Sequence, residues 1–286
     1  MNSCGGECRA GDFSTYARDF YVILVHTLIP QPLMENTSMQ PEDSITRLAQ
    51  RIQSASAISV LTGAGVSSAS GVPTFRGEEG LWKSYSPQEL ATPEAFARNP
   101  ELVWEWYQHR KKVVSESEPN ASHRAIVEME NYFPDVKVIT QNIDNLHKRA
   151  GSKTVYELHG NIERNYCIKC KKVYYDNIPL KDKIPVCECG GLIRPNVVWF
   201  GEYLPQDQFD ASYLAAENAD IFFIVGTSAI VFPAASLIYK AKDSGAALVE
   251  VNIERTEVSG IVDFSLFGKA GEVLPEVLNT IKKLKN

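Results

Sequence analysis

Four short apolar runs constrain the fold of this chain more than any other feature of its sequence. Each run is five residues long and is followed at once by a polar or glycine-containing turn, and helix-length segments separate the runs. This pattern predicts a parallel α/β sheet, whose strands are buried on both faces. Ligands of such sheets bind beyond the carboxyl ends of the strands, so we expect the four turns to converge on one crevice. The runs are AISVL (57–61), VKVIT (136–140), IFFIV (221–225) and ALVEV (247–251).

The turn after the first run reads TGAGVSSASGVPTFRG (62–77). It begins like the phosphate turn of a dinucleotide-binding unit, because Gly63 and Gly65 would let the backbone approach a phosphate closely. Ser68 stands where the third glycine of the hydride-transfer fingerprint belongs, and the chain runs on through Phe75 instead of settling into a helix. No acidic residue clearly ends a second strand to hold a ribose. The turn therefore favours a nucleotide site that differs from that of a dehydrogenase.

Polar groups follow other strand ends as well. The turn TQNIDNLH (140–147) carries Asn142 and Asp144, for which plain helix capping is an alternative interpretation. The turn GTS (226–228) could bind a phosphate or a ribose, but by itself it is a weak signal. The stretch ELHGN contains His159, and a lone histidine is more often structural than catalytic. Its place among the converging turns makes His159 a candidate catalytic residue.

The six cysteines fall into two groups. Cys4 and Cys8 lie near the N-terminus, and the other four form a C-x-x-C pair and a C-x-C pair in a stretch that is poor in apolar residues. Two such pairs can bring four thiolates to a tetrahedral zinc ion. Four protein ligands leave no open position, so the metal would be structural; four free cysteines on a surface insert are the alternative. The candidate ligands are Cys167, Cys170, Cys187 and Cys189.

Bulk properties argue against several classes of partner. The net charge of −6 disfavours a general affinity for nucleic acid. The apolar run at residues 20–29 is too short to span a membrane, which needs about 20 residues. It also lacks the flanks of a secretion signal, because Asp19 precedes it directly. Cysteine usage and the missing signal favour a cytoplasmic location, with an organellar address left open.

Residues 1–38 differ in patterning from the rest of the chain. Regular patterning begins near Met39, which would make a reasonable translation start. We therefore expect this segment to be a poorly ordered N-terminal extension or a start-site artefact.

Tyr107 and Arg110 lie three residues apart in the stretch WEWYQHRKK. On a helix they would share one face. A hydroxyl and a guanidinium fork together suit a carboxylate that is held by two hydrogen bonds. From spacing alone, however, an amphipathic helix with a solvated arginine is the favoured interpretation.

Several motifs occur in the order found in one protein family. They are GAGVSSASGVPTFRG, TQNIDNLHKRAG, ELHGN, the two cysteine pairs, VVWFGE, GTSAIVFPAA and KAGEVLP. In this order they resemble the sirtuins, which are NAD-dependent protein-lysine deacylases, over about residues 42–280. The resemblance implies that NAD is consumed: the acyl oxygen of the lysine attacks the ribose carbon as nicotinamide leaves, and the products are free lysine and O-acyl-ADP-ribose.

The resemblance also implies an α/β fold with two domains inside a catalytic domain at 39–286. A Rossmann-like parallel-sheet domain would carry a smaller zinc-binding and helical domain, and NAD and acyl-lysine would bind in the cleft between them. The large domain would comprise about 39–79, 123–165 and 195–286, and the small domain the inserts at about 80–122 and 166–194.

The resemblance assigns roles to individual residues. His159 would be the general base that deprotonates a ribose hydroxyl, and imidazole suits a base that titrates near neutrality. Asn142 and Asp144 would complete the catalytic set in the nicotinamide pocket, with Gln141 near the ribose. The NAD-binding set would be Gly63, Ala64, Gly65, Phe75, Arg76, Gln141, Asn142, Ile143, Asp144, Gly226, Thr227, Ser228, Asn252 and Ala270. The substrate peptide would add as a strand along VVWFGE, at Val198, Phe200, Gly201 and Glu202.

One departure from the common family pattern concerns the acyl group. Thr74 stands before the Phe-Arg pair, where many sirtuins have an aspartate. The threonine form resembles the class III subgroup, common in bacteria and mitochondria, which also carries Tyr-x-x-Arg on the small-domain helix. Tyr107 and Arg110 match that pattern, so the resemblance reverses the interpretation of this pair. It would bind the distal carboxylate of succinyl- or malonyl-lysine.

The expected partners are therefore acylated lysine-containing proteins, with no nucleic acid and no membrane, and a monomer is compatible with the sequence. Two alternatives stay open: an NAD- or ADP-ribose-binding module without turnover, and a mono-ADP-ribosyltransferase. His159 argues against the first, because simple binding does not require a base.

Overall fold

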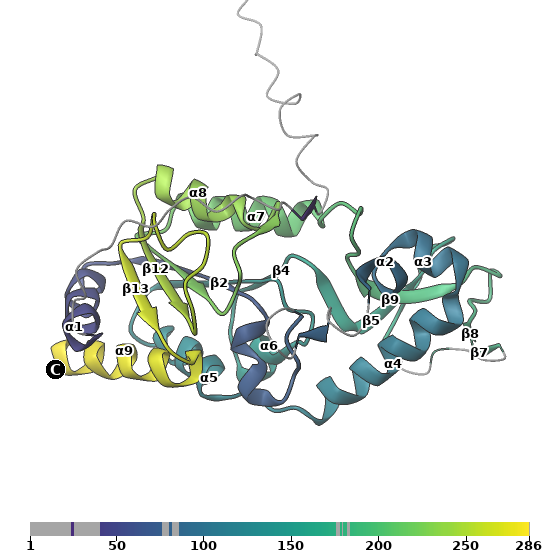
Figure 1. Cartoon of the computed structure of the whole chain (residues 1–286), viewed down its shortest axis with the longest axis horizontal. Coiled ribbons are helices and arrows are strands. Elements are labelled where there is room, and N and C mark those ends of the chain that lie inside the picture. The colour runs from purple at the N-terminus through teal and green to yellow at the C-terminus, as the bar shows by residue number, and fades with distance from the viewer. Residues whose placement is uncertain are drawn as a thin grey trace, which may run out of the picture.

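A six-stranded parallel sheet forms the centre of the molecule (Figure 1). The computed structural model describes residues 24–25, 41–75, 80–81, 86–175, 178, 180–181 and 184–285. The strand order is β13-β12-β10-β2-β3-β4. The strands are β2 (Ala57–Thr62), β3 (Asp135–Thr140), β4 (Val155–Glu157), β10 (Ile221–Val225), β12 (Ala247–Asn252) and β13 (Phe264–Phe267). The predicted parallel sheet is confirmed, and the four apolar runs form β2, β3, β10 and β12.

Helices cover both faces of this sheet, which explains why its central strands are mostly apolar. Within β10, Ile221, Phe223 and Val225 pack in one core, and the alternate residues Phe222 and Ile224 pack in the other. The first face is covered by α1 (Pro41–Ile52), α5 (Ala121–Met129) and α9 (Ala270–Lys285), and the second by α7 (Gln206–Glu217) and α8 (Ser236–Asp243) (Figure 1).

A smaller region beside the sheet combines helices with a three-stranded antiparallel sheet of order β6-β5-β9 (Figure 1). Its own apolar core includes Trp104 and Trp199. Thr92 and Asn99 start two of its helices by accepting hydrogen bonds from backbone N–H groups, and a proline follows each of them. The elements are α2 (Pro87–Leu90), α3 (Pro93–Arg98), α4 (Pro100–Glu116), β5 (Gly160–Cys167), β6 (Val173–Tyr174), β7 (Leu180–Lys181), β8 (Ile184–Pro185) and β9 (Ile193–Val197).

This antiparallel sheet is longer than the zinc-binding insert expected at 166–194. It begins at Gly160 and ends at Val197. The strand β5 therefore starts immediately after His159 and ends at Cys167. It joins the candidate catalytic residue directly to the cysteine cluster.

The parallel register brings the strand ends together. Thr62 pairs with Val225 on one side and with Thr140 on the other, and Thr140 pairs with Glu157. After β2 the chain makes two short 3-10 turns, η1 (Ala64–Val66) and η2 (Ser68–Ser70), and after β3 a loop leads to α6 (Leu146–Ala150). The turns converge at one edge of the sheet, as predicted.

Most of the predicted N-terminal extension at 1–38 lies outside the described residues, as does Arg76. Within the extension, β1 (Leu24–Val25) is described, and it pairs antiparallel with β11 (Val231–Phe232). Among the helices of the described part of the chain, none is long and apolar enough to cross a membrane.

Candidate active site

The turns that follow β2 and β10 pack directly against each other. The N–H of Gly63 donates to the Val225 carbonyl (3.0 Å), and the N–H of Gly65 donates to the Gly226 carbonyl (2.8 Å). A Cβ on Gly63 would lie 2.7 Å from the Gly226 oxygen, and one on Gly65 would lie 2.8 Å from the Gly226 Cα. The contact between the two turns therefore requires both glycines, whether or not a phosphate binds there. Ala64 lies between them.

The turn after β3 joins this pair through a buried amide and a buried carboxylate. Asn142 Nδ2 donates to the Gly63 carbonyl (3.0 Å) and to Ser67 Oγ (3.2 Å). Ser67 Oγ donates to Asp144 Oδ2 (2.7 Å), and Asp144 Oδ1 accepts from the N–H of Leu146 (3.0 Å). Burial raises the pKa of Asp144, and the hydrogen bonds from Ser67 and Leu146 oppose that rise. One Asp144 oxygen thus accepts from the first N–H of α6, although the N-cap residue of that helix is Asn145, and the other oxygen accepts from Ser67.

Ser67 is a site residue that reasoning from the sequence did not identify. Its hydroxyl links Asn142 to Asp144, and its side chain is fully buried. The neighbouring Ser68 is exposed. A Ser-Ser pair carries no sign of which serine turns inward, so the only signal is the position inside the glycine turn.

His159 lies at the same edge of the sheet, between β4 and β5. Its Nδ1 is 2.9 Å from the Gln141 carbonyl oxygen. Because a carbonyl only accepts, Nδ1 carries the proton and Nε2 keeps a free lone pair. Nε2 is buried and has no hydrogen-bond partner. Burial lowers the pKa of His159 to about 4, against a raising effect of the Gln141 carbonyl. This value is below the near-neutral one expected from the sequence, and the imidazole is neutral and able to accept a proton at pH 7.

The other predicted NAD residues continue this edge. Gln141 Nε2 donates to Thr227 Oγ1 (2.9 Å), and Asn252 Nδ2 donates to the Thr227 carbonyl (3.0 Å). Ser228 follows in the same turn. Ala270 is the first residue of α9, which packs against η1. Phe75 instead contacts the core of the smaller region.

The pair Tyr107 and Arg110 is buried on α4, so the interpretation as a solvated arginine is wrong. Arg110 is 4% exposed, and its guanidinium carbon lies 4.9 Å from the centre of the Phe75 ring and 5.5 Å from that of Trp106. Its Nε has no hydrogen-bond partner, and it forms no ion pair with any described carboxylate. Burial lowers the pKa of Arg110.

Tyr107 is equally enclosed. Its hydroxyl accepts a hydrogen bond from Trp199 Nε1 (2.8 Å), and burial raises its pKa to about 12. The tyrosine is therefore neutral and keeps its hydroxyl hydrogen for donation. The Tyr107 hydroxyl and Arg110 Nε are thus two buried hydrogen-bond donors for which the described residues provide no acceptor.

An arginine that the sequence analysis did not identify as a functional residue forms hydrogen bonds with the predicted peptide-binding segment. Arg194 on β9 forms two hydrogen bonds with Glu202, at 2.5 and 2.9 Å. Glu202 Oε2 also accepts from the N–H of Trp199 (2.8 Å). The Glu202 carboxylate is thus occupied within the protein. The N–H groups of Val198 and Phe200 donate to the carbonyls of His159 and Ala91.

The four predicted zinc ligands gather at the end of β5. Their Sγ atoms all lie within 4.8 Å of one another, with Cys167 3.5 Å from Cys189 and Cys170 3.6 Å from Cys187. Four thiolates bound to a tetrahedral zinc at 2.3 Å would lie about 3.8 Å apart. The spacing fits a structural zinc with four protein ligands.

Comparison with known proteins agrees with this arrangement. The model of the Sir2 family matches residues 63–233. An NAD-dependent protein deacylase of Pyrococcus abyssi is 48% identical over 247 residues, which cover 84% of this chain and 99% of the relative. NAD-dependent protein deacylase 2 of Pyrobaculum aerophilum is 51% identical over 225 residues, 78% of this chain and 90% of the relative.

Solved structures give the same result. A complex of a Sir2 homologue with NAD has a TM-score of 0.79 at 45% identity and covers 84% of this chain and 94% of its own. A complex of Sir2 with a p53 peptide and NAD+ has a TM-score of 0.76 at 34% identity, with coverages of 82% and 96%. The fold, the converging turns and the family match lead to one conclusion: the chain belongs to the Sir2 family.

Proposed function

We propose that this protein is an NAD-dependent protein-lysine deacylase. The observation that carries the proposal is the state of His159, a neutral imidazole whose Nδ1–H is held by the Gln141 carbonyl and whose Nε2 is free to accept a proton. A pure NAD- or ADP-ribose-binding module has no need for such a base. The names of the relatives support the same activity.

The residues divide the work as follows. His159 would take a proton from a ribose hydroxyl at Nε2, while its Nδ1–H stays bound to the Gln141 carbonyl. Asn142 and Asp144, linked through Ser67, would bind the nicotinamide group. NAD itself supplies the ribose carbon that receives the acyl oxygen. The products would be nicotinamide, free lysine and O-acyl-ADP-ribose.

We further propose that acidic acyl groups, succinyl and malonyl, are preferred substrates. Arg110 supports this because it is buried and forms no ion pair with a described carboxylate, although it interacts electrostatically with Asp144. A buried cation without a paired anion costs on the order of several kcal/mol. A substrate carboxylate would supply the missing partner, and the hydroxyl of Tyr107 can donate to the same group.

The direct test is to mix the protein with NAD and acetyl-, malonyl- or succinyl-lysine peptides, and to measure nicotinamide release and the deacylated peptide. We expect release with all three and the highest rate with an acidic acyl group. Release without deacylation, with ADP-ribose attached to protein, would identify a mono-ADP-ribosyltransferase instead. The variant His159→Tyr should lose turnover on every acyl group, and a rate near that of the wild type would refute the mechanism.

Acylated lysine-containing proteins are the proposed partners. A cytoplasmic location stays a prediction from the sequence, with which a monomer is compatible. Sedimentation of the purified chain and imaging of the tagged protein test them.

A further inference from the structure

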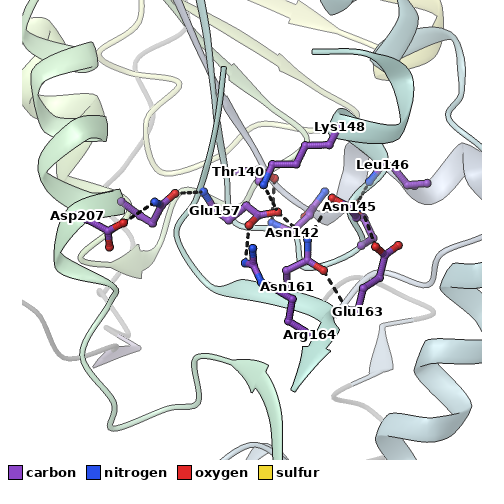
Figure 2. A network of polar contacts seen from close by, with 12 residues as sticks. Thr140, Asn142, Asn145, Leu146, Lys148, Glu157, Asn161, Glu163, Arg164 and Asp207 are labelled. Atoms are coloured by element: carbon purple, nitrogen blue, oxygen red, sulfur yellow. Dashed lines mark hydrogen bonds and ion pairs between the residues drawn. The ribbon is translucent and has the colours of Figure 1, made fainter. Parts of the chain in front are cut away.

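A buried carboxylate at the end of β4 organises a polar network beside the candidate active site (Figure 2). Glu157 is 5% exposed and accepts hydrogen bonds from Asn161 Nδ2 (2.7 Å), Lys148 Nζ (2.9 Å) and Arg164 Nη2 (2.6 Å). Burial by itself would raise the pKa of Glu157, but the hydrogen bonds from Asn161 and Lys148 and the charge of Arg164 lower it overall. Glu157 is therefore ionised at neutral pH.

Asn161 extends this network toward the nicotinamide turn. Its Nδ2 also donates to Asn145 Oδ1 (3.1 Å), and its Oδ1 accepts from the N–H of Glu163 (2.9 Å). Asn145 in turn donates from Nδ2 to Glu163 Oε2 (2.7 Å). Figure 2 shows the Asn145 side chain between those of Asn161 and Glu163. Two residues of β5, Asn161 and Glu163, thus hold the Asn145 side chain by hydrogen bonds to its amide oxygen and from its amide nitrogen.

Asn145 is the residue whose backbone the network controls. It has φ +62°, in the left-handed region that few residues other than glycine and asparagine adopt readily. It lies between Asp144, whose carboxylate belongs to the site, and Leu146, whose N–H holds that carboxylate. A change in φ at Asn145 would rotate Asp144 relative to α6. A backbone hydrogen bond from Ile162 to Ile143 (2.8 Å) ties the same turn to the same strand.

We propose that Asn145, Asn161 and Glu157 are positioning residues that orient Asp144 in the nicotinamide pocket. Glu157 orients the amide of Asn161, Asn161 together with Glu163 holds Asn145, and Asn145 sets the direction of Asp144. None of the three proposed residues needs to touch the substrate. The inference rests on the proposed function, because it assigns the nicotinamide pocket to this turn.

The test compares Asn145→Gly, Asn161→Ala and the double variant with wild type. Glycine adopts the left-handed backbone without strain, so Asn145→Gly removes the side-chain hydrogen bonds that restrain φ at this position. We expect each single variant to weaken nicotinamide inhibition roughly tenfold and to raise the KM for NAD more than it lowers kcat. The double variant should be no worse than the worse single variant, since both break one chain of contacts.

Gln208→Ala is the matched control. Gln208 Oε1 accepts from the N–H of the same Glu157 (3.0 Å), on the side of the network that leads to α7 instead of Asn145. It should leave nicotinamide inhibition and the KM for NAD unchanged. A merely structural network would instead lower the melting temperature of all variants and leave both constants unchanged; this outcome, or additive effects in the double variant, would overturn the proposal.

Calorimetric titration of NAD and of nicotinamide provides a readout without turnover. If the wild type binds NAD but releases no nicotinamide, the proposed function fails, and weaker binding to Asn145→Gly than to Gln208→Ala still supports the positioning role. If all proteins bind NAD and nicotinamide equally, the positioning role fails whatever the activity. Because Asn145→Gly changes only a partly exposed loop residue, this variant decides the test even if Asn161→Ala does not fold.

Discussion

Two buried arginines in the smaller region, each 4% exposed, have opposite surroundings. Arg194 forms two hydrogen bonds with Glu202 and a third with the Val197 carbonyl, and its guanidinium stacks on Trp199. Arg110 contacts the rings of Phe75 and Trp106 and has no described carboxylate partner. In both arginines Nε lacks a hydrogen-bond partner, so the two differ in whether a described carboxylate pairs with the guanidinium. Arg194 has the surroundings of a structural residue, whereas the acidic acyl group that we propose as substrate would supply the carboxylate that Arg110 lacks.

Removal of zinc should have the largest effect on stability, because the metal site stabilises the antiparallel sheet that carries Arg194. Arg194 lies on β9, beside the strand β5 that ends at Cys167. Zinc bound by four thiolates contributes about 10 kcal/mol or more of apparent folding energy. We expect a chelator to unfold the antiparallel sheet and to lower the melting temperature, as measured by circular dichroism with the metal content followed in parallel. Full heat stability of the metal-free protein would contradict the zinc assignment.

Arg194→Met should destabilise the protein by about 3–5 kcal/mol, because it leaves the Glu202 carboxylate partly buried without its cation. Urea denaturation measures this loss. Adding Glu202→Gln as a second change should restore part of the stability, since it removes the unpaired charge. Wild-type stability of the single variant would mean that the two arginines do not differ as described.

Arg110→Met should affect activity instead of stability. We expect stability to be unchanged or higher, because no described carboxylate loses a partner. Two charge-assisted hydrogen bonds to a substrate carboxylate would be lost, so desuccinylation should fall about 100-fold while deacetylation stays largely intact. Rates on matched succinyl- and acetyl-lysine peptides measure the difference. Equal loss of both activities would make Arg110 a structural residue like Arg194.

The smallest expected effect is a change of stability with pH that is caused by His159. Like Arg110, this residue has a buried nitrogen atom without a hydrogen-bond partner. Its pKa in the folded protein is about 4, and an unfolded histidine titrates near 6.5. The unfolded chain therefore binds more protons between these values, so this contribution to stability is present above about pH 6.5 and is lost as the pH falls toward 4. Urea denaturation at pH 7 and pH 4.5 should show a smaller acid loss for His159→Gln than for wild type. Equal losses would place the pKa near its ordinary value.

Much of the fold could be predicted because its signals are local. A strand buried on both faces is mostly apolar, so the apolar runs of β2, β3, β10 and β12 stand out in the sequence even though Ser59, Lys137 and Glu250 interrupt three of them. The spacing of the two cysteine pairs likewise predicted that their four sulfur atoms lie close together. The extension of β5 and β9 beyond the expected insert could not be predicted. Their antiparallel pairing joins residues that are distant in the sequence, and no short motif marks it.

The site was predicted less completely. Asn142, Asp144 and His159 could be placed at strand ends, and the structure brings them to one edge of the sheet. Ser67 and Arg194 were not identified, because each is defined by a partner distant in the sequence. The near-neutral pKa expected for His159 was wrong for the same reason: burial is a property of the assembled molecule.

The sequence by itself determined four strands of the parallel sheet, the order of the turns and the zinc-ligand set, since apolar runs and short spacings act over a few residues. Only the tertiary structure decided which polar groups are satisfied. Tyr107 and Arg110 have a spacing that any helix could carry, and the sequence alone favoured a solvated arginine. Packing against Phe75 and Trp106 removed Arg110 from water without giving it a described carboxylate. Burial and partnership depend on residues far apart in the chain, and they separate Arg110 from Arg194.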